Sequence, residues 1–318
     1  MNDVAITVDR VTRRFGAVEA VRGLSFEVRR GEMFGLIGPD GAGKTTTIRL
    51  LCGLLRPDAG AIRVLGRDPV RQHGALTRSV GYLSQRFSLY GDLSIDENIA
   101  FFAEIHGVGA YQATRDRLLE MTQLAPFRDR LADRLSGGMK QKLALACTLV
   151  HEPEAIILVE PTTGVDPVSR REFWKLLSEF LSQGMTILMA TPYLDEAERC
   201  SRVALLDRGR LLAIDTPGRL RALLPGVILE VIAQPQRAAL DALARVPGVI
   251  EAQTFGERIH VRLSAEREPE ADQVLALLAR AGLAVTSVRR VPSSLEDVFI
   301  SRVTTPAPME APQQGRPA

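Results

Sequence analysis

The chain has 318 residues, of which 46% are hydrophobic and 25% charged, and its formal net charge is +2 at pH 7. The length exceeds one average domain, and the apolar fraction is sufficient for a soluble protein with a buried core. Acidic and basic residues are spread along the whole length, and no block of like charge indicates a nucleic-acid partner.

The first predicted elements are short strands separated by turns that contain glycine. They cover residues 5–11, 24–28 and 33–37. A helix is expected from Gly43 to about Leu55, so a glycine loop joins the third strand to a helix.

A helical insert is predicted over roughly residues 94–135. Ser94 and Glu97 have the spacing of a capping box. Helical periodicity follows over residues 95–105 and again over residues 110–123.

Strands and helices continue to alternate beyond the long helix expected after Ser136. Residues 155–159 and 186–190 are short apolar runs, as expected of parallel strands buried on both faces. Between them, Asp166 and Pro167 predict the cap and first turn of a helix. This order indicates a parallel α/β sheet.

A second domain is predicted over residues 226–303. Its expected order is strand, helix, strand, strand, helix and strand, which is typical of a small ferredoxin-like α+β domain. The elements cover residues 227–233, 238–245, 250–255, 259–263, 271–281 and 284–290. Residues 304–318, rich in Pro, Gln and small residues, are expected to be disordered.

A phosphate-binding loop follows the third strand and opens a helix, which is the context that this motif requires. Its residues are Gly38, Pro39, Asp40, Gly41, Ala42, Gly43, Lys44, Thr45 and Thr46. The glycines let backbone N–H groups surround phosphate oxygens at the helix N-terminus. Lys44 is expected to reach the β- and γ-phosphates, and Thr45 to ligate Mg²⁺. Alone, this loop indicates only a nucleotide binder, a class that includes kinases and GTPases.

A second helix start with glycines lies further along the chain. It reads Leu135, Ser136, Gly137, Gly138, Met139, Lys140 and Gln141. A serine and two glycines at a helix N-terminus can bind an anion, although this segment alone could also be only a well-capped helix.

The two motifs, in this order, resemble the Walker A loop and the signature motif of the ATP-binding cassette (ABC) family. The resemblance covers residues 1 to about 215. It implies a P-loop ATPase core with antiparallel β and helical subdomains over residues 1–222, with ATP and Mg²⁺ as cofactors. In that family two cassettes face each other, and the signature residues Ser136, Gly137 and Gly138 bind the γ-phosphate of ATP held by the partner.

The resemblance implies further roles for four residues. Phe15 stacks on adenine, Gln85 senses Mg²⁺ and the membrane partner, Glu160 polarises the attacking water and Asp166 makes a contact across the dimer. Three of them have an alternative: Phe15 could be a core aromatic, Gln85 an ordinary loop residue and Asp166 only a helix cap. Glu160 follows a buried parallel strand, where α/β sheets bind their ligands.

Two family residues are missing. The Asp expected before the catalytic Glu is Val159, and the switch His expected after strand 186–190 is Pro192. Loss of a group that supports a metal typically costs ~10–100-fold, and loss of a transition-state donor costs ~10²–10³ in rate. ATP binding is expected to survive while hydrolysis is slow, with Tyr193 or Thr191 as possible substitutes for the histidine.

The end of the second domain, residues 293–300, resembles drug-exporter subunits of the daunorubicin-resistance type, which favours export over import. A short amphipathic helix that closes a small domain would read the same. The expected partners are a transmembrane permease and a second cassette. The second cassette is either an identical chain or a different one, and the different one is the favoured interpretation. Alternatives are a cassette protein of translation or DNA repair, and a regulatory cassette with little hydrolysis.

The location expected is the cytoplasm, on the inner face of the cell membrane. No apolar run approaches the ~20 residues of a membrane span, and the N-terminus lacks the pattern of a leader. Cys52, Cys147 and Cys200 are far apart in apolar surroundings, which predicts a reducing compartment and neither disulfides nor a zinc site.

Overall fold

The computed structural model describes residues 3–85, 89–264 and 271–304. The chain divides into two compact units, Met1–Pro217 and Gly218–Ala318. The tail predicted to be disordered lies outside the described residues, except for Thr304.

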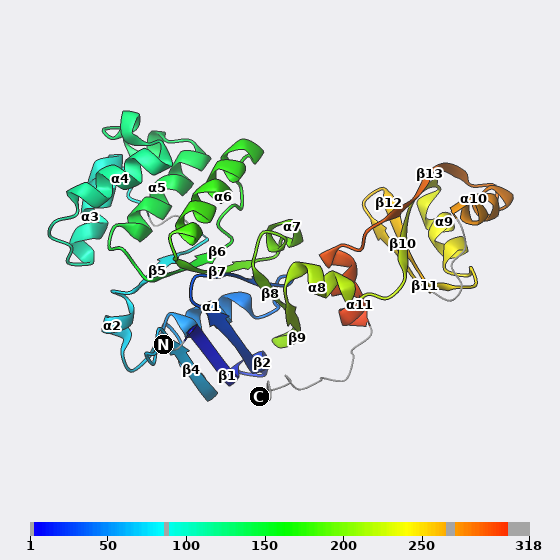
Figure 1. The fold of residues 1–318 in the computed structure, drawn as a ribbon, viewed down its shortest axis with the longest axis horizontal. Coiled ribbons are helices and arrows are strands. Elements are labelled where there is room, and N and C mark those ends of the chain that lie inside the picture. The colour runs from blue at the N-terminus through cyan, green and yellow to red at the C-terminus, as the bar shows by residue number, and fades with distance from the viewer. Residues whose placement is uncertain (1–2, 86–88, 265–270, 305–318) are drawn as a thin grey trace. The chain divides into compact units, whose positions relative to one another are not determined.

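A six-stranded sheet forms the centre of the first unit, in the order β5-β6-β7-β3-β8-β9 (Figure 1). Its strands are β3 (Met33–Ile37), β5 (Val80–Leu83), β6 (Ala155–Val159), β7 (Thr186–Thr191), β8 (Arg202–Asp207) and β9 (Arg210–Asp215). All are parallel to their neighbours except β9, which pairs antiparallel with β8. Every residue of β3, β6 and β7 is buried, because helices or a second sheet cover both faces.

The second sheet of this unit is antiparallel, in the order β2-β1-β4. Its strands are β1 (Val4–Phe15), β2 (Val18–Arg29) and β4 (Ala59–Val64). The first two are longer than predicted, because register shifts in their pairing interrupt the apolar alternation that marks a strand in a sequence. Apolar side chains of both sheets and of α1 (Lys44–Leu51) form one core.

Helices cover both faces of the six-stranded sheet: α1 lies on the side of the small sheet, and α5 (Gly137–Leu149) and α6 (Pro167–Ser182) lie on the other (Figure 1). The insert helices α3 (Ile95–Ile105) and α4 (Gln112–Thr122) pack against α5. The predicted capping box of Ser94 and Glu97 is present at the start of α3. Shorter helical elements are α2 (His73–Leu76), α7 (Leu194–Ala197), Ala125–Phe127 and Ala132–Arg134.

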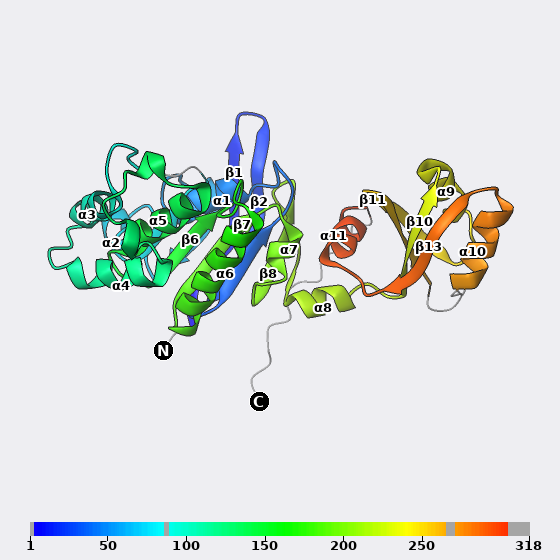
Figure 2. The same ribbon diagram turned by 90° about the horizontal axis from the view of Figure 1, so that it is seen from above.

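The second unit contains a ferredoxin-like sheet, in the order β11-β12-β10-β13 (Figures 1 and 2). Its elements are β10 (Val227–Gln234), α9 (Gln236–Leu243), β11 (Val249–Phe255), β12 (Arg258–Leu263), α10 (Ala271–Arg280), β13 (Ala284–Val291) and α11 (Leu295–Thr304). Alternate residues of the strands pack with α9 and α10 in an apolar core of this unit. The short helix α8 (Pro217–Ala222) spans the boundary between the units.

Candidate nucleotide-binding site

The phosphate loop connects β3 to α1 and leaves no room for a side chain at two of its glycines. A Cβ atom on Gly38 would lie 2.2 Å from the carbonyl oxygen of Leu206. Gly43 has φ +97°, and a Cβ there would lie 2.5 Å from the carbonyl oxygen of Ala20. The loop is therefore pressed against the backbones of β2 and β8, and the start of α1 is fixed where the motif requires it.

Lys44, the first residue of α1, directs its amine into the loop. Its Nζ donates hydrogen bonds to the carbonyl oxygens of Gly38 (2.6 Å) and Pro39 (2.9 Å), and the residue is only 5% exposed. Burial lowers the pKa of Lys44, while the charges of Asp40 and Glu160 oppose that shift. A phosphate placed here would offer this partly desolvated cation a charged acceptor in place of neutral carbonyls, which strengthens the hydrogen bonds.

A cavity of about 420 Å³, the nucleotide cavity, opens in front of the loop. Its volume is typical of a site for a small ligand. The lining residues predicted from the sequence are Asp40, Gly41, Ala42, Gly43, Lys44, Thr45, Thr46 and Glu160. The residues not predicted are Val18, Glu19, Ala20, Arg22 and Arg208, which come from β2 and from the turn between β8 and β9.

Glu160 stands at the end of β6, where its backbone has φ +46°, unusual for a residue with a side chain. Its N–H donates to the carbonyl oxygen of Ala190 at the end of β7 (2.8 Å). The Nε2 of Gln85 and the hydroxyl of Thr163 both donate to its carboxylate, at 2.8 and 3.3 Å. Two predicted residues from different loops therefore meet, because parallel strands end at the same edge of the sheet.

Gln85 borders a second cavity of about 410 Å³, with Leu89, Gly91, Ala132, Asp133, Lys140 and Thr163. Glu160 borders the nucleotide cavity. The hydrogen bond between Gln85 and Glu160 therefore joins the two cavities.

The positions of the two missing family residues are occupied by groups that cannot replace them. Val159 is 4% exposed and belongs to the apolar core shared with α1, so it offers no oxygen to a metal or water. Thr191 is buried, and its hydroxyl accepts the backbone N–H of Tyr193 (3.1 Å). Tyr193 is 37% exposed, and the guanidinium carbon of Arg170 lies 5.8 Å from the centre of its ring. Tyr193 therefore remains the available candidate for the role of the missing histidine.

The signature residues lie beside Asp166 and do not line the nucleotide cavity. Ser136 caps α5 by accepting from the N–H of Met139 (3.3 Å). A Cβ on Gly138 would lie 2.1 Å from the hydroxyl oxygen of Ser169 on α6, so the two helix starts are in close contact. Asp166 caps α6 by accepting from the N–H groups of Val168 and Ser169 at 3.0 Å, and hydrogen bonds from Ser169 hold its pKa below the ordinary range.

Phe15 ends β1 and is 45% exposed. It is not among the lining residues of the nucleotide cavity, but its partner across the β1–β2 pair, Val18, is. The core alternative for Phe15 does not hold, because a core aromatic would be buried.

The side chains beside Lys44 fit Mg²⁺ in part. Thr45, Gln85 and Glu160 carry oxygen donors, which Mg²⁺ prefers, and Val159 adds none. Among the described residues there is no group of three or more His, Cys, Asp or Glu that could hold a metal. Most remaining ligands would therefore be phosphate and water oxygens, as is usual for Mg²⁺ at nucleotide sites.

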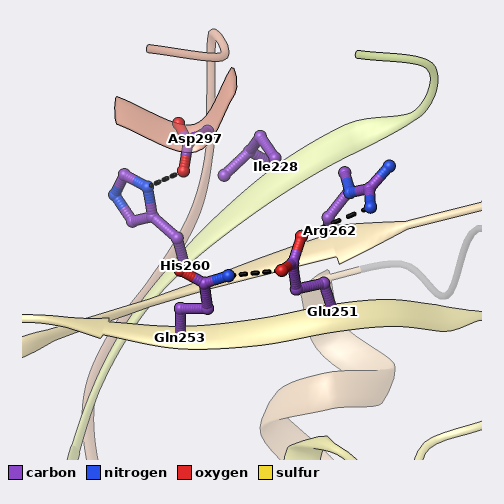
Figure 3. A pocket seen from close by; sticks show the side chains of 6 residues that line it. All are labelled: Ile228, Glu251, Gln253, His260, Arg262 and Asp297. Atoms are coloured by element: carbon purple, nitrogen blue, oxygen red, sulfur yellow. Dashed lines mark hydrogen bonds and ion pairs between the residues drawn. The ribbon is translucent and has the colours of Figure 1, made fainter. Parts of the chain in front are cut away.

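A small cavity of about 10 Å³ lies in the second unit and has room for about one water molecule. It is lined by Ile228, Glu251, Gln253, His260, Arg262 and Asp297 (Figure 3). The Nδ1 of His260 lies 2.9 Å from a carboxylate oxygen of Asp297 on α11. This cavity is too small for a nucleotide or drug, and its ion pair links α11 to β12.

None of the described helices has the length and apolar character needed to cross a membrane. The three cysteines, Cys52, Cys147 and Cys200, are free and buried.

Comparison with known protein families gives two matches. Residues 21–163 match the family model described as ABC transporter, and residues 216–303 match the model described as ATP-binding protein DrrA1-3-like, C-terminal domain.

Similar sequences cover nearly the whole chain. A probable multidrug ABC transporter ATP-binding protein of Escherichia coli, YbhF, is 40% identical over 98% of this chain, which spans only 54% of that protein. The daunorubicin resistance ATP-binding protein DrrA3 of Streptomyces coeruleorubidus is 36% identical, over 94% of this chain and 96% of its own length. A solved ATP-binding subunit of an ABC transporter is 31% identical with a TM-score of 0.62, covering 69% of this chain and 92% of its own.

Proposed function

The chain belongs to the family of ABC transporter ATP-binding proteins, and from that premise we propose that it binds and hydrolyses ATP to drive an exporter. The observation that carries this proposal is the buried amine of Lys44 inside the phosphate loop, at the end of a cavity large enough for a nucleotide. Export is supported by the match of the second unit to a DrrA-type domain and by relatives named for multidrug and daunorubicin resistance.

The residues in and beside the nucleotide cavity have separate roles in the transfer of the γ-phosphoryl group to water. Lys44 and the backbone N–H groups at the start of α1 hold the β- and γ-phosphates. Glu160, oriented by the hydrogen bond from Gln85, accepts a hydrogen bond from the attacking water and aligns it. Mg²⁺, when bound with Thr45 and Gln85, neutralises charge on the phosphates.

The second half of the site comes from another cassette. The signature residues Ser136, Gly137 and Gly138, with Asp166 beside them, are proposed to bind the γ-phosphate of ATP held by a partner cassette. The helical insert, residues 94–135, is proposed to pass closure of the two cassettes to a transmembrane permease. The chain then works at the cytoplasmic face of the membrane.

We further propose that the partner is a different cassette with the residues that this chain lacks. Two identical chains would place Val159 and Pro192 in both sites. A mixed pair would keep one competent site, to which this chain contributes its signature motif. The observation that supports this proposal is the presence of Val159 and Pro192 at the two positions.

Titration calorimetry with MgATP tests the site. The Lys44→Ala variant is expected to lose most of the affinity, because it removes the fixed cation opposite the phosphates. Lys175→Ala is the matched control: Lys175 lies on α6, away from the phosphate loop in the sequence, and its loss should leave the affinity unchanged. An affinity that Lys44→Ala leaves intact would show that the nucleotide binds elsewhere.

A further inference from the structure

One face of the Phe15 ring is covered by a cation. The guanidinium carbon of Arg13, two residues earlier on β1, lies 4.9 Å from the ring centre. That distance is within the range of a cation–π interaction. Residues two apart on a strand share a face, so the contact follows from the strand geometry.

Asp58 fixes that guanidinium in place. One carboxylate oxygen accepts from Nη1 of Arg13 at 2.7 Å, and the other accepts from the backbone N–H of Arg14 at 2.7 Å. The N–H of Asp58 in turn donates to the carbonyl oxygen of Thr12 (2.9 Å). The backbone hydrogen bond from Arg14, followed by the charge of Arg13, holds the pKa of Asp58 below its ordinary range, so the carboxylate is ionised at neutral pH.

The uncovered part of Phe15 remains open, since the residue is 45% exposed although Arg13 lies against its ring. Phe15 is paired across the β1–β2 hairpin with Val18, which lines the nucleotide cavity together with Lys44. An aromatic base that extends from phosphates held at Lys44 can therefore reach the open side of the ring.

We propose that Arg13 and Asp58 are positioning residues for the purine base: Asp58 holds Arg13, and Arg13 holds Phe15 at the angle at which its open face stacks on the base. This rests on the proposed ATP site and adds two residues to it. The arrangement is a three-layer stack of guanidinium, ring and base. A pair that only held β1 against the segment before β4 would be needed equally for nucleotides and for ligands without a base.

The test compares full-length variants by calorimetry with MgATP and with magnesium tripolyphosphate, which carries the phosphates but no base. Arg13→Met keeps the aliphatic stem and removes the charge. It is expected to weaken ATP binding by about twofold to fivefold, the size of a cation–π contact in a partly exposed site, and to leave tripolyphosphate binding unchanged. Asp58→Asn is expected to behave in the same way. Arg10→Met is the matched control, because Arg10 lies on the same strand with its side chain 82% exposed, and it should change neither ligand.

A double-mutant cycle decides whether Arg13 acts through the ring. Phe15→Ala alone should weaken ATP binding by about fivefold or more, as loss of base stacking does, and adding Arg13→Met should then weaken it no further. An undiminished effect of Arg13→Met in the Phe15→Ala background would overturn the proposal, as would an equal loss of tripolyphosphate affinity. Lys44→Ala tests the proposed ATP site separately. This variant should lose affinity for both MgATP and tripolyphosphate, and only unchanged binding in this variant would contradict the ATP site itself.

Discussion

Val159 is the residue whose surroundings most limit the chemistry of the nucleotide cavity. It ends β6 directly before Glu160, and its side chain faces the apolar core on the side of α1. A carboxylate at this position would lie on the side of the sheet from which Lys44 and Thr45 begin α1. Valine in place of the family's Asp therefore removes an oxygen that could have supported a metal. It also makes this part of the core fully apolar.

Restoring both lost groups is expected to raise the ATPase rate of the purified chain. Val159→Asp with Pro192→His should increase it by at least about tenfold, the lower end for recovering a group that supports a metal. The same variant should melt at a lower temperature without nucleotide, because it buries an unpaired carboxylate, and MgATP should recover part of the loss.

Val159→Ala with Pro192→Ala is the matched control for this pair, since it removes the same side chains and adds no donor. Its rate should stay at the level of the unmodified chain. If the unmodified chain already turns over at the rate of the restored variant, the exposed Tyr193 becomes the candidate for the role of the missing histidine.

The site residues that could be predicted from the sequence are those carried by contiguous motifs. Residues 40–46 and Glu160 line the nucleotide cavity, and each follows a buried strand that the sequence marks by its apolar run. Arg22 and Arg208 could not be predicted, because they come from a strand and a turn that only the fold brings together. Arg13 had a signal: a cation two residues before an exposed aromatic on one strand shares its face.

At the scale of elements, the ion pair between His260 and Asp297 makes α11 sensitive to pH. The hydrogen bond to Asp297 raises the pKa of His260, and the nearby Glu230 carboxylate adds to the rise. Burial raises the pKa of Asp297, but hydrogen bonds from His260 and Ser294 outweigh that effect and the pKa is lowered overall. Arg258 and Arg289 pair with Glu230 at 3.0 and 2.7 Å, so that carboxylate stays ionised beside the histidine.

His260 and Asp297 stabilise α11 over different ranges of pH. The contribution of His260 is fully present below its unfolded pKa of about 6.5 and is lost as the pH rises through the raised folded value. The contribution of Asp297 to stability is present above its unfolded pKa of about 3.9. It is lost only as the pH falls through the lowered pKa that Asp297 has in the folded protein. The pair therefore stabilises α11 most between these two unfolded values.

Hydrogen exchange of the full-length chain measures this. After correction for intrinsic rates, the amides of α11 are expected to exchange faster at pH 9 than at pH 6. The amides of α9, in the core of the same unit, are the internal control. His260→Gln should remove the difference, and a difference that persists in this variant would assign the effect to another group.

Predicted elements were most accurate where both faces of a strand are buried. The ranges predicted at 33–37 and 155–159 are those of β3 and β6, and the helix predicted at 95–105 is α3, whose capping box fixes its start. The first helix ends at Leu51, earlier than predicted, because Gly53 has φ +71° and packs against the backbone of Pro69. The strands β4, β5, β8 and β9 were not predicted, since each pairs with a strand distant in sequence or lies at an edge of its sheet.

For the whole molecule, nucleotide binding is expected to require the first unit and not the second. Every residue of the proposed nucleotide site precedes Pro217, where the first unit ends. A chain truncated to residues 1–225 should therefore fold and bind MgATP within about threefold of the full chain, a difference below 1 kcal/mol. The same truncation with Lys44→Ala should not bind. A folded truncated protein with no affinity for ATP would mean that the second unit contributes to the site.

The choice between two identical cassettes and a mixed pair can be decided with this chain alone. Lys44→Ala disables the phosphate loop, and Ser136→Ala disables the signature motif. In a dimer of identical chains, mixing the two variants gives some pairs in which the loop of one chain meets the signature of the other, and both parts of that site are intact. Such a site would restore turnover that neither variant has alone.

The mixed-pair proposal predicts that this complementation restores no more than the slow turnover of the unmodified chain. Even the reconstituted site would contain Val159 and Pro192, so the mixture should hydrolyse ATP no faster than the slow unmodified chain. Repeating the mixture in the Val159→Asp, Pro192→His background should make complementation appear, at a rate ~10²–10³ above either single variant, the cost of removing a transition-state donor. If the unrestored mixture already turns over as fast as the restored one, two copies of this chain make a working site, and the second, different cassette is unnecessary.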